Sequence, residues 1–169
     1  YYHENFQLWT QSIHFALEGR MNFHHEATNL KVGGGLDDVW LNKKTSELHI
    51  VEYKSTSQRT EGKKITLNDP WKVSYKRQMD FYVWVMLKKK FNVSKKGFFL
   101  YCDGDRFENY TFLELERANM RFKMTLIPYD VDLSWIDSTL YDIKNCLSLD
   151  LPPSHSENCE YGNFISQID

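Results

Sequence analysis

Residues 47–54, Glu-Leu-His-Ile-Val-Glu-Tyr-Lys, place an acid and a lysine at the end of a mostly apolar run. The run Leu48–Val51 is typical of a central strand that is covered on both faces. Because side chains alternate along a strand, Glu52 and Lys54 share one face. A carboxylate at the end of a buried strand is costly unless a partner compensates it. The segment therefore predicts a central strand of a sheet with a charged site at its end.

A second acidic strand precedes this one. Residues 36–42 and 47–54 are expected to form a hairpin across the polar turn Asn42–Ser46. Asp37, near the start of the first strand, then lies close to Glu52 and Lys54. Two carboxylates beside an ammonium group can hold a divalent cation, which polarises a phosphate and lowers the pKa of a bound water. The hairpin therefore suits phosphodiester hydrolysis.

The order of these residues resembles the PD-(D/E)XK nuclease superfamily. Its signature is an Asp at the start of one strand and (Asp/Glu)-x-Lys on the next, which Asp37 and Glu52-Tyr53-Lys54 match. The family's Asp follows a Gly-x-hydrophobic pattern, and Gly34-Gly35-Leu36 places Asp37 there. Asp38 stays an alternative, because a slip of one residue in register exchanges the faces of the two aspartates.

A second motif resembles the RecB-like branch of that superfamily, which carries Gln-x-x-x-Tyr on the helix after the catalytic strands. Gln78 and Tyr82 match it. Residues four apart share one helix face, and in the family that face looks onto the active site. The resemblance implies that Gln78 and Tyr82 contact substrate DNA.

The same resemblance implies a metal centre and a catalytic set. Asp37, Glu52 and the main-chain carbonyl of Tyr53 would coordinate Mg²⁺ or Mn²⁺, and Lys54 would orient the attacking water or stabilise the transition state. Many relatives add a ligand upstream of the Asp, with His25 as one alternative here. Other residues considered for that position are Glu4, His14, Glu18, His24 and Glu26.

The net charge of −2 does not by itself predict a nucleic-acid partner, but the distribution of charge is uneven. Residues 54–97 contain 12 Lys and Arg and three acids, whereas the rest of the chain has nine basic and 20 acidic residues. A basic segment beside acidic metal ligands suits a polyanion held over a cation. The expected phosphate contacts are Lys63, Lys64, Lys72 and Lys76.

Length and composition fit one globular domain over residues 1–169, or a fragment of a longer chain. Hydrophobic residues make up 41% and aromatic residues 15% of the sequence, enough for a sizeable core. No apolar run is long enough for a membrane span. Three cysteines without regular spacing favour a reducing, cytoplasmic setting. An iron–sulfur cluster, found in some RecB-like relatives, is not expected because the C-terminal tail keeps only Cys159.

The hydrophobic pattern predicts an α/β fold with a mixed central β-sheet flanked by helices in αβββαβ order. The resemblance implies that this is a restriction-endonuclease-like core. Helices are expected over residues 4–18 and 69–90, with Asp69 as N-cap and Pro70 at the first position. A third helix opens with a capping box of Ser134 and Asp137, and Pro152-Pro153 ends regular structure. The remaining strands are expected at residues 21–31, 97–103 and 121–128.

These features favour a Mg²⁺- or Mn²⁺-dependent deoxyribonuclease of the RecB-like type, acting on single- or double-stranded DNA with a helicase or another nucleic-acid-processing partner. The first alternative is an inactive nuclease-fold domain that binds nucleic acid or a protein. A structural α/β domain with no nucleic-acid role is the second.

Overall fold

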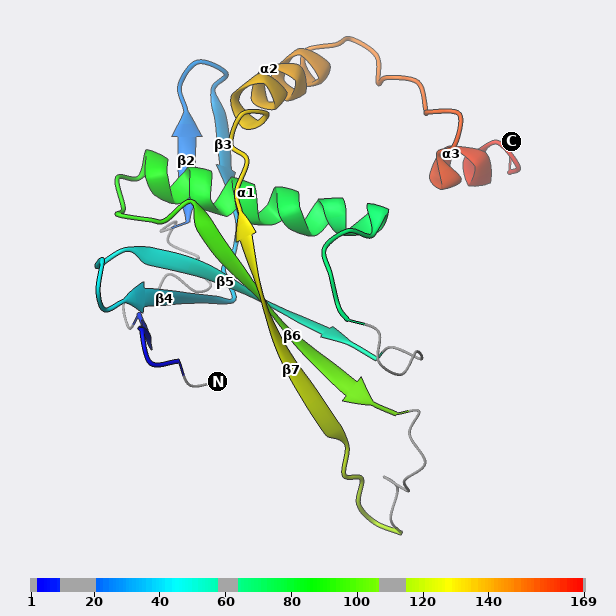
Figure 1. The fold of residues 1–169 in the computed structure, drawn as a ribbon. Helices are drawn as coiled ribbons and strands as arrows, with labels where there is room; N and C mark the ends of the chain where they lie inside the picture. The colour runs from blue at the N-terminus through cyan, green and yellow to red at the C-terminus, as the bar shows by residue number, and fades with distance from the viewer. Residues whose placement is uncertain (1–2, 10–20, 58–63, 107–114, 169) are drawn as a thin grey trace.

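One five-stranded mixed sheet organises the chain, with helices and a separate hairpin on one side of it (Figure 1). The computed structural model describes residues 3–9, 21–57, 64–106 and 115–168. The strands are β1 (Phe6–Leu8), β2 (Asn22–His25), β3 (Leu30–Gly33), β4 (Asp38–Asn42), β5 (Leu48–Thr56), β6 (Lys96–Asp105) and β7 (Arg121–Asp130). The helices are the 3₁₀ turn η1 (Pro70–Lys72), α1 (Val73–Lys88), α2 (Ile136–Leu147) and α3 (Glu160–Ile165).

The sheet has the strand order β1-β4-β5-β6-β7, and β2 and β3 form a separate two-stranded sheet. β5 and β6 are parallel, and α1 makes the crossover between them, whereas the other neighbours are antiparallel. In Figure 1, α1 lies across one face of the sheet, and α2 and the β2–β3 hairpin lie beyond it. The predicted α/β class with a mixed, restriction-endonuclease-like sheet is confirmed.

Burial on both faces of β5 explains why this strand is central. Leu48, Ile50 and Glu52 are buried on the face that α1 covers, and Ile50 belongs to the large core with Met79 and Val83 of α1. Val51 is equally buried on the other face, in a smaller cluster with Trp40, Phe98 and Leu100. The apolar run therefore has the doubly covered environment that its composition predicts.

The β4–β5 hairpin forms where the sequence predicts it. Asn42 and Ser46 close the turn through a main-chain hydrogen bond from Ser46 N to Asn42 O of 2.8 Å, and Asn42 Oδ1 accepts from Lys44 N at 2.9 Å. Ser46 has a positive φ of 58°. The turn holds β4 and β5 in a register that pairs Asp38 with Val51.

The helix predicted over residues 4–18 is wrong where the structure describes it. Phe6–Leu8 form β1, which pairs antiparallel with β4, and residues 10–18 lie outside the described part of the chain. The Phe6 ring lies 5.0 Å from that of His49 and 5.5 Å from that of Phe98. Pairing with the sheet and packing of this half-buried ring outweigh the local helical spacing of the sequence.

The single strand predicted over residues 21–31 is also wrong, because the segment folds back on itself. β2 and β3 form an antiparallel hairpin that pairs His25 with Leu30. Thr28 N and Asn29 N donate to the carbonyls of His25 and Glu26, and Asn29 has a φ of 55°. Asparagine tolerates this left-handed conformation, so the Thr-Asn pair is a turn signal that the alternation of apolar residues concealed.

The second predicted helix begins at Pro70, as expected, with the η1 turn leading into α1. Asp69 precedes it, but its side chain does not cap the helix and instead pairs with Lys72 Nζ at 2.8 Å. α1 ends at Lys88, two residues before the predicted end, and Lys90 has a φ of 64°. The predicted buried stripe is confirmed at Met79, Tyr82, Val83 and Met86, while Leu87 is half-buried.

The C-terminal helices differ from prediction at their ends. No capping box forms, because the Ser134 hydroxyl donates to Asp132 at 2.6 Å and α2 begins at Ile136. Regular structure resumes after the two prolines, since α3 follows them with the Cys159 thiol accepting a hydrogen bond from Gly162 N. Among the described helices, none has the length and apolar character that crossing a membrane requires.

Substitution of Ile50 by alanine tests the importance of the α1-facing core. Ile50 is 0% exposed, and we expect Ile50→Ala to lower the free energy of unfolding by about 2–5 kcal/mol, because the deletion leaves a cavity. Leu151 is 78% exposed, so Leu151→Ala should change it by less than about 0.5 kcal/mol. Urea denaturation of both variants provides the measurement, and equal effects would contradict the assignment of the core.

Candidate active site

Asp37 and Glu52 meet at the open end of the β4–β5 hairpin. The register pairs Asp38 with Val51, so the next pair outward is Asp37 with Glu52. Alternation along both strands places these two carboxylates on the face that α1 covers. Asp37 Oδ2 accepts a hydrogen bond of 2.9 Å from Tyr53 N. The Asp37 carboxylate therefore accepts the hydrogen bond of Tyr53 N just beyond the last pair of the β4–β5 ladder, where no β4 main-chain carbonyl is paired with it.

Lys54 lies on the same face, two residues further along β5. Its Nζ is 3.1 Å from Glu52 Oε2 and 3.2 Å from Gln78 Oε1. The Glu52 side chain is 2% exposed and that of Lys54 15% exposed, so the pair is largely screened from water. The two contacts hold the ammonium group between β5 and α1.

One face of α1 supplies three further polar or aromatic groups. Gln78 Nε2 donates to the Tyr82 hydroxyl at 3.0 Å, so Gln78 links Tyr82 to Lys54. The Tyr75 ring lies 4.8 Å from Lys54 Nζ, in cation–π contact. A Cβ on Gly34 would lie 2.6 Å from Tyr82 Cε1, so only glycine lets the chain before Asp37 approach this ring. The result is one connected group over the hairpin end.

Glu52 has an unusual protonation equilibrium. Burial raises the pKa of its carboxyl to about 7, the charge of Lys54 opposes that rise, and the nearby Asp37 carboxylate adds to it. Glu52 Oε1 is buried and has no hydrogen-bond partner within the described residues. A buried carboxylate oxygen without a donor is costly, and a cation at that oxygen would remove the cost.

The oxygen donors at this site fit a hard divalent cation. Two carboxylates and a main-chain carbonyl are the ligands that Mg²⁺ and Mn²⁺ prefer. The N–H and C=O of one strand residue point to the same side, so the Tyr53 carbonyl lies on the side where its N–H meets Asp37. Within the described ranges, no group of three or more His, Cys, Asp or Glu side chains is placed to hold a metal. Water or substrate oxygens would have to complete the coordination shell.

Asp38, the alternative to Asp37, lies on the opposite face of the sheet. It is 6% exposed and accepts hydrogen bonds from Val39 N at 2.8 Å, from Trp40 Nε1 at 3.2 Å and from the Tyr53 hydroxyl. With Trp40 and Tyr53 it borders a cavity of about 490 Å³ on that face. The oxygens of Asp38 point away from Glu52 and already have three donors, so the geometry favours Asp37 for the site.

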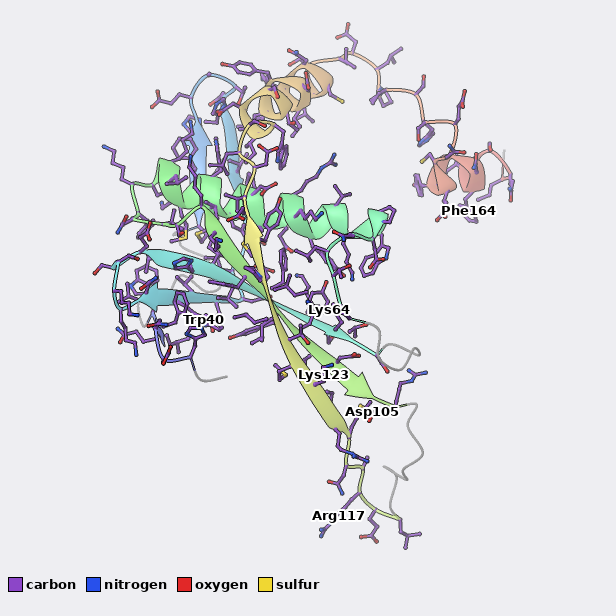
Figure 2. All side chains as sticks on the ribbon, in the orientation of Figure 1. Trp40, Lys64, Asp105, Arg117, Lys123 and Phe164 are labelled. Carbon is purple, nitrogen blue, oxygen red and sulfur yellow. The ribbon has the colours of Figure 1, made fainter. Side chains whose placement is uncertain are left out.

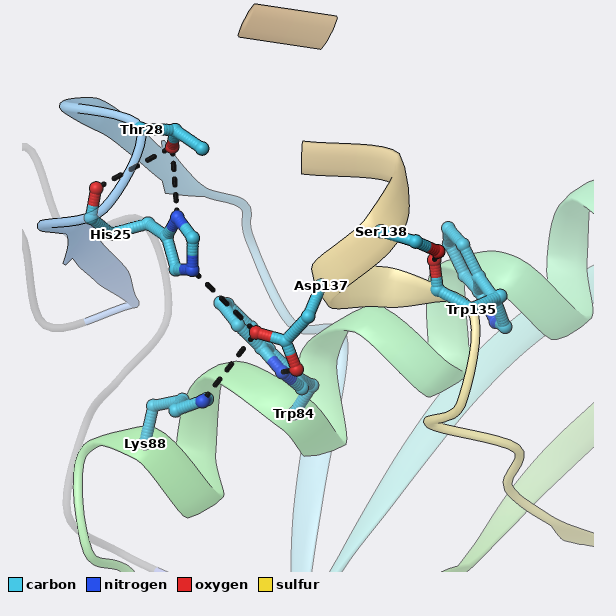
Figure 3. A network of polar contacts seen from close by, with 7 residues as sticks. All are labelled: His25, Thr28, Trp84, Lys88, Trp135, Asp137 and Ser138. Atoms are coloured by element: carbon cyan, nitrogen blue, oxygen red, sulfur yellow. Dashed lines mark hydrogen bonds and ion pairs between the residues drawn. The ribbon is translucent and has the colours of Figure 1, made fainter. Parts of the chain in front are cut away.

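His25, the alternative upstream ligand, belongs to a different polar network (Figure 3). Its Nδ1 is 2.8 Å from Thr28 Oγ1, and its Nε2 is 3.5 Å from Asp137 Oδ1 of α2. Asp137 also lies 3.6 Å from Lys88 Nζ and accepts from Trp84 Nε1 at 3.4 Å. This network joins the β2–β3 hairpin to α1 and α2, so His25 has no place beside Asp37 in this structure.

The four predicted phosphate-binding lysines have different environments. Lys72 is 2% exposed, and its Nζ donates to Thr66 O at 2.7 Å and pairs with Asp69. The Lys72 ammonium is thus enclosed and paired in this structure, which disfavours a contact with a phosphate. Lys64 is exposed on the segment leading from β5 into η1 (Figure 2), and Lys76 is half-buried on α1. Lys63 lies outside the described residues.

Sequence reasoning missed Tyr75. Its ring beneath Lys54 makes it part of the site, and it lies three residues before Gln78 and seven before Tyr82. That spacing places all three on one helix face, so extending the motif by one helical turn would have found it. Tyr101 of β6 was missed as well. It lies opposite Lys54 in the β5–β6 register, and burial raises the pKa of its hydroxyl to about 12.

The raised pKa of Glu52 predicts a pH dependence of stability. The folded protein retains a proton that the unfolded chain releases near pH 4.5, so metal-free protein should lose up to about 3 kcal/mol of stability between pH 4.5 and 7. Mg²⁺ should bind about tenfold more weakly per pH unit below 7, because it competes with that proton. Thermal unfolding in EDTA and in Mg²⁺ measures both effects.

Glu52→Gln should remove both effects, since the amide does not titrate, whereas the exposed Glu157→Gln should retain them. A difference between wild type and Glu52→Gln that does not vary with pH would contradict the assignment.

The comparison with known families agrees with this geometry. The model of the PD-(D/E)XK nuclease superfamily matches residues 2–165. Neither the curated proteins nor the solved structures gave a match. Proteins of this superfamily generally use divalent metals such as Mg²⁺. The matched residues span almost the whole chain and include the β4–β5 hairpin and α1, so the protein belongs to the PD-(D/E)XK nuclease superfamily.

Proposed function

We propose that the protein is a nuclease that hydrolyses DNA phosphodiester bonds with Mg²⁺ or Mn²⁺. The observation that supports this most directly is the convergence of Asp37, Glu52 and Lys54 on one face at the end of the β4–β5 hairpin. Membership of a nuclease superfamily supports a nucleic-acid substrate. The choice of DNA and of the cation belongs to the proposal.

Asp37, Glu52 and the Tyr53 carbonyl would hold the cation in this proposal. When bound, a divalent cation there supplies polarisation of the phosphate and acidification of water. The chain contributes a buried carboxylate, Glu52, whose charge is compensated by Lys54 at 3.1 Å. Because the Glu52–Lys54 pair is largely screened from water, its charges act more strongly on a phosphate than they would at the surface.

Lys54 is suited to a direct role in the reaction. Glu52, Gln78 and the Tyr75 ring restrict its ammonium group to one position. A preorganised ammonium group stabilises negative charge on the transferring phosphate without having to reorient during the reaction. In its fixed position it can also donate a hydrogen bond that orients the attacking water. Loss of this group should therefore reduce the rate more than it reduces substrate affinity.

The finer assignment to the RecB-like branch is supported by Gln78 and Tyr82. The two side chains are joined by a hydrogen bond, and Gln78 contacts Lys54. In this proposal they contact the substrate strand, with Lys64 and Lys76 as phosphate contacts and Lys63 kept as a sequence prediction. A single nuclease domain over residues 1–169, a helicase or similar partner and a cytoplasmic location also remain predictions.

An inactive domain that binds nucleic acid or a protein is the second candidate. One observation favours it: in the described part of the chain, no third acidic or histidine side chain joins Asp37 and Glu52. A site that relies on water and substrate for its remaining ligands holds a cation more weakly. Cleavage assays separate this candidate from the nuclease.

Substitution of Lys54 tests the proposed reaction. We expect Lys54→Ala to lower kcat by about 100-fold or more, because a charged group directed at the transition state is lost, while Mg²⁺-dependent stabilisation is retained. Lys44→Ala, an exposed lysine in the turn at the other end of β4 and β5, should have wild-type activity. The measurement is cleavage of end-labelled single-stranded DNA, duplex DNA and RNA with Mg²⁺, Mn²⁺ or EDTA.

Equal activity of Lys54→Ala and wild type would overturn the catalytic assignment. Salt-dependent binding of DNA by a wild-type protein that cleaves no substrate with either cation would favour the inactive binding domain.

A further inference from the structure

We propose that Trp71 is a stacking platform for one unpaired nucleobase of the substrate, within about three nucleotides of the bond that is cleaved. The inference rests on the proposed nuclease function and specifies its substrate as a single strand or a frayed end. Trp71 lies in η1, directly before α1, and its side chain is 60% exposed. A large aromatic surface left in water beside a catalytic site is well suited to binding a flat, apolar group.

The indole of Trp71 is anchored, although much of its surface is exposed. The Tyr75 ring meets it edge to face, with ring centroids 5.5 Å apart and an interplanar angle of 83°. The Lys72 ammonium lies 5.0 Å from the indole centroid, and Lys72 is itself held by Thr66 and Asp69. An anchored ring loses little conformational entropy when a base stacks on it.

Two sets of contacts connect Trp71 to the catalytic strand. The first passes through Tyr75, whose ring is 4.8 Å from Lys54 Nζ. The second passes through Lys72, whose ammonium is 5.4 Å from the ring of Tyr101, the residue opposite Lys54 in β6. Both sets place Trp71 on the face of the sheet that carries the candidate active site.

The distance limits which nucleotide could stack there. The Trp71–Tyr75 and Tyr75–Lys54 distances, 5.5 Å and 4.8 Å, place the indole centroid within about 10 Å of Lys54 Nζ. Stacked nucleotides rise about 3.4 Å each along a strand. A phosphate held at Lys54 therefore has a base one to three nucleotides away within reach of the indole.

The local charge favours a nucleic acid over a protein as the group that covers Trp71. The sequence from Lys54 to Gln78, which brackets Trp71, contains seven basic and two acidic residues, and a positive field attracts a polyanion. Stacking also requires a base that is not enclosed in a duplex. The combination predicts a preference for single-stranded substrate at this position.

Substitutions of Trp71 in a Lys54→Ala background test the inference by binding alone. We expect Trp71→Ala to raise the Kd for a labelled single-stranded oligonucleotide by about 5- to 150-fold, and Trp71→Leu to behave alike because leucine is apolar but not planar. Trp71→Phe should stay within about threefold of the parent. Phe164→Ala, which removes an aromatic ring 59% exposed on α3, should not change the Kd for the single strand. The affinity of the Trp71 variants for duplex DNA should differ from that of the parent by less than twofold.

An abasic scan distinguishes stacking from a structural role. A single abasic site moved along the oligonucleotide should weaken binding of the parent at one position, and that position should lose its effect in Trp71→Ala. A uniform loss of affinity at every position, or no loss at all, would overturn the inference while leaving the nuclease proposal intact. If the parent binds no nucleic acid and wild type cleaves none, the proposed function itself fails. Thermal unfolding of each variant confirms that it is folded.

Discussion

The pairing of β4 with β5 is the constraint on which the rest of the site depends. Asp38 opposite Val51 determines that Asp37 comes opposite Glu52 and that both lie on the face covered by α1. A shift of β4 by one residue would place Asp38 on the face covered by α1 and turn Asp37 toward the far face. Buried side chains on both faces of β5, with Ile50 and Val51 each 0% exposed, make that shift costly.

Burial of Glu52 connects stability with chemistry. The same apolar surroundings that stabilise the sheet raise the pKa of this carboxyl, and no donor among the described residues reaches one of its oxygens. Lys54 compensates part of the charge, and Gln78 and Tyr75 hold that lysine from the helix side. Burial of the Glu52 carboxylate is therefore only partly compensated by the protein. Such shifted protonation equilibria are common at functional sites. A substitution that changes the packing around Glu52 is therefore expected to change both the stability of the sheet and the protonation of this carboxyl.

The other face of the sheet has a structural task. Asp38 accepts from the Trp40 indole and the Tyr53 hydroxyl, and burial with this hydrogen bond raises the pKa of that hydroxyl. Asp37 and Asp38, which are adjacent in sequence, thus serve opposite faces, one beside Glu52 and the other fastening β4 to β5. The Tyr53 main chain meets Asp37 while its side chain meets Asp38. The hairpin end is held from both sides.

Local sequence alone determined the hairpin at 42–46, the doubly buried strand β5, the start of the main helix at Pro70 and the spacing of Gln78 and Tyr82, because each depends on neighbouring residues and on a regular period. Only the tertiary structure decided that Phe6 joins the sheet, that Asp37 rather than Asp38 lies beside Glu52 and that Lys72 is buried. These outcomes depend on contacts between residues distant in the chain. The sequence pattern does not contain the burial and the hydrogen-bond partners of a charged side chain. These determine which of several similar carboxylates or ammonium groups can contact a ligand.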